Sequence, residues 1–366
     1  MHWGHATSTD LLHWEHKPIA LFPDEHGLIF SGSAVVDFEN TSGFGTKENP
    51  PLVAIFTYHL MDGEKAGRKD FQTQGIAYSL DNGDTWTKYD GNPVIGNDGI
   101  KDFRDPKVLW DEVNHVWVMA LVAGDHLQLW NSKDLKNGPN EVEGTDEEKW
   151  VLLISINPGA PNGGSGTQYF IGDFDGEKFT TDQTETKWLD WGTDNYAGVT
   201  YNVLPKGYYG DTYKNDPKQD RIFIGWMSNW AYARDTPTEK WRSAMTVPRK
   251  LSLKKVNDNY SLFNYPVSEM ESIIDNATKK NITVSAGTKE SISFVDLNQS
   301  EMLFKTASKN FQLKVSNSLN EEVVLTMFGD EKQFFLDRTG SGKVDFQENF
   351  SGVQQMPVPD LPADGI

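Results

Sequence analysis

Short apolar runs separated by turn residues dominate the first two thirds of the chain. The clearest runs are residues 52–58, 116–122, 150–156 and 221–227. They are rich in β-branched and aromatic residues and are bounded by Gly, Asn, Asp and Ser, a pattern typical of β-strands. No long stretch repeats apolar residues at the i, i+3, i+4, i+7 spacing of an amphipathic helix. The pattern predicts an almost all-β protein with few, short helices.

Similar turns recur between these runs. A Ser-x-Asp sequence leads into a turn at Ser8, Ser79 and Ser132, and in the first two cases a Trp follows. The hairpin of residues 172–179 resembles them. Asp side chains close such turns by accepting hydrogen bonds from their own backbone. Recurring hairpins favour the blades of a β-propeller, although unrelated hairpins in a β-sandwich would give the same pattern.

The pattern changes after residue 255. From about residue 261 tryptophan disappears, and alternating runs at 282–284, 291–294, 311–315 and 323–327 predict an antiparallel β-sandwich. Residues 268–274 are compatible with a short helix at the junction. We therefore expect a first domain over residues 1–255 and a sandwich over residues 261–366. The few predicted strands and the loop-like residues 357–366 suggest that this sandwich is incomplete.

Composition narrows the class of function. A chain of 366 residues with a net charge of −19 and no cysteine predicts about two domains without disulfides or thiolate chemistry. The acidic balance argues against nucleic acid and anionic membranes as partners and favours a neutral substrate. No apolar run is long enough to span a bilayer, and no signal peptide is expected at the N-terminus.

One short motif carries candidate chemistry. Phe103-Arg104-Asp105-Pro106 follows a loop and leads into a run that reads as a buried strand. The guanidinium of Arg104 is expected to lower the pKa of Asp105 and to keep its carboxylate ionised beside a sugar ring. Taken alone, such a sequence is more typical of a turn with a surface ion pair.

Several further motifs change this interpretation. In chain order they are Trp3-Gly4-His5-Ala6, Asp10-Leu11 with His13-Trp14, Phe30-Ser31-Gly32-Ser33, Ser155-Ile156-Asn157-Pro158-Gly159-Ala160-Pro161, Asp194-Asn195-Tyr196-Ala197, Gly225-Trp226-Met227-Ser228-Asn229-Trp230, Trp241-Arg242 with Pro248-Arg249, and Phe334-Phe335-Leu336-Asp337-Arg338. Together with Phe103-Arg104-Asp105-Pro106, they resemble the β-fructosidases, a family that comprises levanases, exo-inulinases and invertases. The resemblance is collinear over nearly the whole chain.

The resemblance implies a five-bladed β-propeller followed by a C-terminal β-sandwich, with a pocket on the propeller axis. Family members are retaining glycosidases that use an aspartate nucleophile and a glutamate acid/base. By match of motif, Asp105 is expected to be the transition-state stabiliser, with Arg104 as its partner. Phe30 and Ser31 are expected to line the fructose pocket, Trp226 to form an aromatic wall, and Asp194 to lie near the substrate. The implied substrate is a fructan or sucrose, with no cofactor or metal, in a secreted or periplasmic setting.

Two family motifs are not found in this sequence. The nucleophile's Asn-Asp-Pro-Asn-Gly and the acid/base's Glu-Cys-Pro are both absent. Glu141, Glu143, Glu147 and Glu148 lie where the second motif is expected, but they are typical of a solvated acidic loop. We therefore expect impaired hydrolysis by the chain as written. A non-catalytic fructan-binding remnant and a fructosyltransferase are the alternatives, because all three would keep the residues that are present.

Three other constellations have simpler explanations. His5 and His13 lack a third ligand at metal-like spacing, so surface or packing roles are favoured. The glycine-rich residues 162–167 are followed by no Lys at phosphate-loop spacing. The acidic turn at residues 81–84 is explained by hairpin chemistry without calcium.

Overall fold

The fold is almost entirely β. The computed structural model describes residues 1–111, 114–133, 140–141, 148–201, 220–256, 258–275, 278–294, 297 and 300–358. Within these ranges the helices are one short α-helix, α1 (Met61–Lys65), and a 3₁₀ helix, η2 (Ser268–Ile273). None of the helices in the described ranges is long and apolar enough to cross a membrane. The all-β prediction and the short helix at the junction are confirmed.

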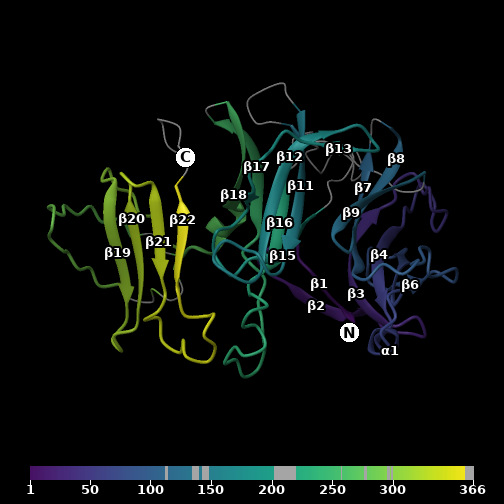
Figure 1. Cartoon of the computed structure of the whole chain (residues 1–366), viewed down its shortest axis with the longest axis horizontal. Helices are drawn as coiled ribbons and strands as arrows, with labels where there is room; N and C mark the ends of the chain where they lie inside the picture. Colours follow the sequence, from purple (N-terminus) through teal and green to yellow (C-terminus); the bar gives the residue numbers. More distant parts are fainter. Residues whose placement is uncertain are drawn as a thin grey trace.

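Five antiparallel sheets follow one another along residues 3–266 of the described chain (Figure 1). The first sheet pairs β1 (Trp3–Thr7) with β2 (Glu15–Leu21). The second contains β3 (Leu28–Val36), β4 (Leu52–His59), β5 (Gln72–Ser79) and β6 (Thr87–Lys88). The third contains β7 (Phe103–Asp111), β8 (Val116–Ala123) and β9 (His126–Ser132). The fourth contains β10 (Asn140–Glu141), β11 (Glu148–Ile156), β12 (Gly166–Phe174), β13 (Phe179–Thr180) and β14 (Lys187–Trp188). The fifth contains β15 (Tyr196–Thr200), β16 (Arg221–Trp226), β17 (Arg249–Val256) and β18 (Asn259–Pro266).

A sixth sheet stands at one end of the molecule, at the left of Figure 1. Its strands are β19 (Asn310–Ser316), β20 (Glu322–Phe328), β21 (Gln333–Asp337) and β22 (Val353–Pro357). It contains the predicted strands at 311–315 and 323–327. The division into domains over residues 1–255 and 261–366 stays a prediction, and the hairpin of β17 and β18 runs past residue 255 to Pro266.

Two of the strands predicted between residues 261 and 366 were wrong. Residues 282–284 and 291–294 adopt no strand, and Ile282, Val284 and Phe294 are exposed. Alternation of apolar and polar residues indicates only that a segment could place its apolar side chains on one face of a sheet. A strand also needs a neighbour that completes its backbone hydrogen bonds, and no strand among the described residues pairs with these two segments.

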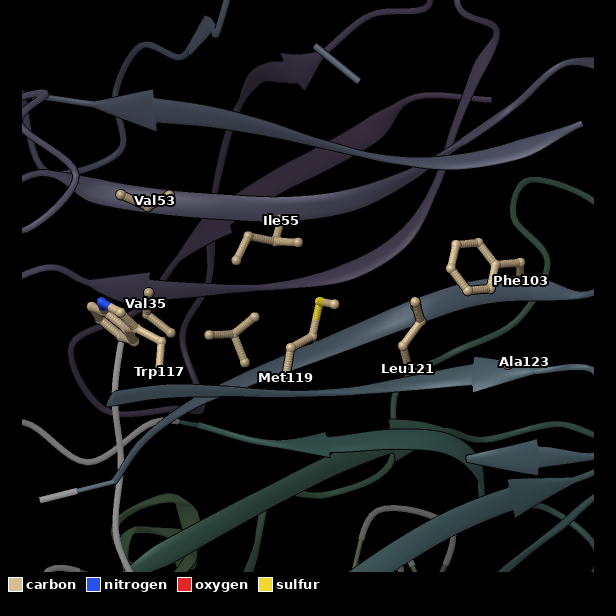
Figure 2. Packing of buried hydrophobic residues seen from close by; sticks show 9 residues of the cluster. Val35, Val53, Ile55, Phe103, Trp117, Met119, Leu121 and Ala123 are labelled. Atoms are coloured by element: carbon tan, nitrogen blue, oxygen red, sulfur yellow. The ribbon is translucent and has the colours of Figure 1, made fainter. Parts of the chain in front are cut away.

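The best-defined part of the core lies between the second and third sheets. Figure 2 shows side chains from β3 and β4 facing side chains from β7 and β8. The buried members of this cluster are Val35, Val53, Ile55, Phe103, Val108, Trp117, Met119, Leu121 and Ala123. Burial of this many large apolar side chains is the main force that fixes β7 against β3 and β4.

Two further clusters of buried apolar side chains link the other sheets within residues 3–266. One joins the first sheet to the second and consists of Leu21, Ile29, Phe56, Tyr58 and Ala77. The other joins the fourth sheet to the fifth and consists of Tyr169, Ile171, Leu189, Phe223 and Leu253. Each sheet buries one face against a sequence neighbour, as the blades of a propeller do.

The predicted turns are closed by their aspartates. Asp10 Oδ1 accepts hydrogen bonds from the amides of Leu12 and His13 at 2.9 and 2.8 Å. Asp81 and Asp175 accept backbone amides in the same way, from Thr85 and from Lys178. The Asp–backbone chemistry expected for these hairpins is confirmed at Asp10, Asp81 and Asp175, while Asp134 of the predicted turn after Ser132 lies outside the described residues.

A polar cluster around Arg338 attaches the sixth sheet to the preceding sheets, and hydrogen bonds between Asn162 and Gln355 of β22 add a second contact. Arg338, directly after β21, donates from Nη1 to Asp194 Oδ2 at 2.7 Å and from Nη2 to the hydroxyls of Thr193 and Tyr232, both at 3.1 Å. Its Nε donates to the carbonyl of Phe350 at 2.8 Å. Only 13% of the Arg338 side chain is exposed, so this ion pair is largely shielded from water.

We predict that Arg338→Met lowers the free energy of unfolding by about 3 kcal/mol, because the shielded carboxylate of Asp194 loses its cation. Urea unfolding followed by tryptophan fluorescence measures the change. Lys314→Met is the matched control, since its ion pair with Glu322 in the same sheet is exposed and should be worth no more than about 0.5 kcal/mol. Equal effects of the two variants would contradict the prediction.

Candidate active site

Four strands depart from regular pairing where the sequence motifs occur. Register shifts interrupt β1 after Trp3, β3 after Ile29, β7 after Arg104 and β15 after Tyr196. Each is the first strand of its sheet, and each shift lies toward the start of the strand. Bulges re-aim side chains and are common beside active sites. These strand ends therefore define the candidate site.

Asp105 lies in the bulge of β7 and has a strained backbone. Its φ is +63°, in the left-handed region that non-glycine residues rarely adopt. Pro106 follows it, and a residue before proline is normally held in an extended conformation. Strain of this kind persists only where the surrounding structure enforces it, and it concentrates at functional sites.

Arg104 lies between two carboxylates. Its Nη1 donates to Asp102 Oδ1 at 2.5 Å, and its Nε lies 3.6 Å from Asp105 Oδ2. The closer partner is therefore Asp102, which the sequence motif did not single out. The ion pair predicted between Arg104 and Asp105 is present at the longer distance.

The expected pKa shift of Asp105 was wrong in sign. Burial raises the pKa of its carboxyl group above the ordinary value, and the positive charge of Arg104 offsets this only in part. The negative charge of Asp102 raises the pKa further. Desolvation is the largest of these effects, and the attraction of Arg104, which also pairs with Asp102, does not reverse it.

Asp105 is nevertheless accessible. Its side chain is 47% exposed, although the surrounding protein is dense enough to desolvate it. Solvent therefore reaches the carboxyl group, while protein atoms pack densely around it. This is the setting in which a carboxylate can meet a ligand.

An aromatic side chain of the fifth sheet lies within electrostatic reach of Asp105, and two tryptophans follow it. Burial raises the pKa of the Tyr196 hydroxyl, and the charge of Asp105 raises it further, which places Tyr196 within electrostatic reach of the carboxylate. The ring of Trp226 lies 6.3 Å from that of Tyr196, and the ring of Trp230 lies 4.9 Å beyond it. The structure thus brings Trp226 to the same end of the sheets as Asp105, while its contact with a sugar stays a prediction.

Phe30 is held by a histidine that the motifs did not include. Its ring stacks on His59 at 4.1 Å with an interplanar angle of 5°. His59 is only 3% exposed, and its ring nitrogens lie 3.1 Å from Glu64 Oε2 and 3.1 Å from Gln72 Nε2. Gln72 is buried as well, so Phe30 rests on a rigid polar support.

The two serines of the Phe30-Ser31-Gly32-Ser33 motif differ in role. Ser31 is exposed beside Phe30, which suits a group that contacts a ligand. Ser33 is buried, donates to the carbonyl of Pro106 at 3.0 Å and accepts the amide of Val108 at 3.0 Å. Ser33 therefore fixes β3 to β7 directly after Asp105. Its place in a motif was visible in the sequence, but its partners were not.

Asp194 is the predicted site residue with the most intramolecular contacts. Both of its oxygens accept hydrogen bonds from protein groups, one from Arg338 and the other from the Tyr232 hydroxyl. Burial and the charge of Asp194 raise the pKa of Tyr232 to about 12. A contact between Asp194 and substrate stays a prediction. What the structure describes is its part in the attachment of the sixth sheet.

A hollow lies beside Trp230. A cavity of about 430 Å³ is lined by Asn157, Trp230, Arg234 and Asp235. The guanidinium of Arg234 lies 5.8 Å from the Trp230 ring centroid. Among the described residues, no group of three or more His, Asp or Glu side chains is arranged to hold a metal ion.

We predict that Asp105→Asn raises the thermal stability of the chain at pH 7. The pKa of Asp105 is raised on folding, so its ionised form opposes folding at pH values above the folded pKa. This cost disappears below the unfolded value of 3.8. Asn also tolerates a positive φ. Differential scanning calorimetry should show a higher Tm for the variant at pH 7 and a smaller difference near pH 3.5. A lower Tm at pH 7 would contradict the prediction.

Comparisons with known proteins agree with the motifs. The N-terminal domain model of glycosyl hydrolases family 32 matches residues 1–139 and 138–266. A levanase from Bacillus subtilis is 41% identical over an alignment 391 positions long. The alignment covers 98% of this chain and 55% of the levanase. An extracellular exo-inulinase from Aspergillus ficuum is 37% identical over an alignment 417 positions long. The alignment covers 98% of this chain and 75% of that protein.

A solved structure shows the same fold. A fructofuranosidase from Schwanniomyces occidentalis in complex with fructose superposes with a TM-score of 0.79 at 30% identity. The superposition covers 99% of this chain and 76% of the other. It supports a β-propeller followed by a β-sandwich as the fold of this chain. From the motifs, the fold and these matches together, the chain belongs to glycosyl hydrolases family 32.

Proposed function

We propose that this chain recognises the terminal β-fructosyl unit of levan, inulin or sucrose in the pocket around Asp105. The observation that carries the proposal is the strained, accessible carboxylate of Asp105 beside Arg104, with Tyr196 within electrostatic reach. The similar proteins are named levanase, exo-inulinase and fructofuranosidase, and one of them binds fructose. These names supply the substrate class.

The geometry suits a sugar that carries developing positive charge. An oxocarbenium-like transition state gains from a fixed carboxylate and from groups that hold its hydroxyls. Asp105 supplies the charge, and Arg104 supplies hydrogen-bond donors. Phe30 and Trp226 supply apolar faces on which the sugar ring can rest.

We also propose that the 366-residue chain hydrolyses fructosides poorly. A retaining mechanism needs a nucleophile and an acid/base, and neither family motif for them occurs in the sequence. The family model matches in two stretches that meet at residues 138 and 139, where the Glu-Cys-Pro motif is expected. The side chains of Glu141, Glu143, Glu147 and Glu148 lie outside the described residues. General acid catalysis typically contributes a factor of about 10²–10⁴, so loss of the acid alone would be severe.

A fructan-binding protein without catalysis is the second candidate. The two missing motifs would remove catalysis, while the carboxylate of Asp105 would still be present to bind the sugar. A fructosyltransferase would need the same nucleophile and acid/base as a hydrolase, so nothing in this chain favours it over hydrolysis. The relatives named as extracellular exo-inulinases support a site of action outside the cell.

We predict that the purified chain binds fructose and releases little of it from levan, inulin or sucrose. Isothermal calorimetry measures binding, and a coupled fructose assay measures release. Asp105→Asn should weaken fructose binding about tenfold or more, because a charged hydrogen-bond acceptor is lost.

The outcomes separate the candidates. Binding without release supports the fructan-binding protein, and release that disappears in Asp105→Asn supports the hydrolase. Transfer of fructose to a sugar acceptor, seen as longer oligosaccharides by chromatography, would identify the transferase. A folded chain that neither binds nor releases fructose would overturn the proposal.

A further inference from the structure

We propose that Thr57 and Gln74 are positioning residues that hold Asp105 in its strained conformation through a closed ring of hydrogen bonds. No motif identified in the sequence contains either residue. The inference rests on the proposed function, because it assigns these side chains to the site built around Asp105. It adds that side chains of the second sheet hold the backbone of β7 in the third sheet.

The ring is short and continuous. Gln74 Nε2 donates to the carbonyl of Phe103 at 2.9 Å. The Thr57 hydroxyl donates to Gln74 Oε1 at 2.7 Å and accepts the amide of Asp105 at 3.1 Å. The ring therefore closes on the backbone of β7 on both sides of Arg104.

The chemistry of the partners fixes every donor. The carbonyl of Phe103 can only accept, so the amide nitrogen of Gln74 must face it. This leaves Gln74 Oε1 toward Thr57, whose single hydroxyl proton satisfies it. The hydroxyl oxygen is then free to accept the Asp105 amide. One arrangement satisfies all four groups.

The ring lies in the protein interior. Thr57 and Gln74 are both 0% exposed and are directly opposite each other in the pairing of β4 with β5. Two polar side chains at such positions cost free energy unless their hydrogen bonds are made. These bonds reach across to the next sheet, so the position of β7 decides whether the two groups are satisfied.

The position of the ring explains how the strain at Asp105 is maintained. With a φ of +63° before proline, the Asp105 backbone would relax if its amide were released. Ser33 fixes the following segment through Pro106 and Val108. The second sheet thus holds β7 immediately before and immediately after the carboxylate, which sets the direction of the Asp105 side chain.

The test compares three variants of the full chain. Thr57→Val keeps the shape of the side chain and removes the hydroxyl. Thr57→Ser keeps the hydroxyl and removes a methyl group. Val53→Ala is the matched control, since it weakens the buried core of the same strand without touching the ring. Fructose binding by calorimetry is measured at least 15 °C below the Tm of each variant.

A second readout follows the ring itself. Amide hydrogen exchange at Asp105, in a chain labelled with ¹⁵N-aspartate, reports its bond to Thr57 without any need for a sugar. We expect Thr57→Val to bind fructose about tenfold more weakly and to exchange the Asp105 amide at least tenfold faster. Thr57→Ser and Val53→Ala should stay within about threefold of the parent chain in both measurements.

Each outcome has one meaning. Thr57→Val with unchanged binding and unchanged exchange overturns the inference. Equal losses of binding in Thr57→Val and Val53→Ala also overturn it, because general destabilisation would then explain both. If the parent chain binds no fructose, the proposed function fails, and exchange at Asp105 alone decides whether Thr57 and Gln74 hold its backbone.

Discussion

The packing of the second sheet on the third is the interaction on which the candidate site depends. Val35, Val53 and Ile55 bury their side chains against Trp117, Met119 and Leu121, and Phe103 closes one end of this cluster. Phe103 is followed by Arg104 and Asp105, so the apolar contact that anchors β7 also fixes where the backbone of Asp105 lies relative to the second sheet. Apolar burial supplies the free energy, but it is non-directional and cannot aim a side chain.

Direction comes from a few buried polar groups. Ser33, Thr57 and Gln74 extend from the second sheet and form hydrogen bonds with the backbone of β7, in and beside its bulge. Buried polar groups of this kind are costly when unpaired, so the arrangement that satisfies all of them is strongly preferred. The strain at Asp105 is thus maintained by packing and hydrogen bonding elsewhere, as is common where a backbone is shaped for a ligand.

Attachment of the sixth sheet and the candidate site share one segment of chain. Asp194 and Thr193 bind Arg338, and Tyr196, two residues further on, feels the charge of Asp105. The residues that attach the sixth sheet and a tyrosine within electrostatic reach of Asp105 are therefore close neighbours in the chain.

The sequence by itself determined the predominance of β-strands, most of the predicted strand positions and the identity of the motif residues. These properties follow from local periodicity, turn chemistry and collinear motifs, which need no knowledge of neighbours. Tertiary structure decided the rest. The pKa of Asp105 rises because protein surrounds the carboxyl group and Asp102 adds its negative charge. Residues 282–284 and 291–294 form no strand, and no strand in the described part of the chain pairs with them. Thr57, Gln74 and His59 gain their roles from partners far away in the sequence. Desolvation, pairing and long-range hydrogen bonds are properties of the folded neighbourhood, so no local pattern of residues could have revealed them.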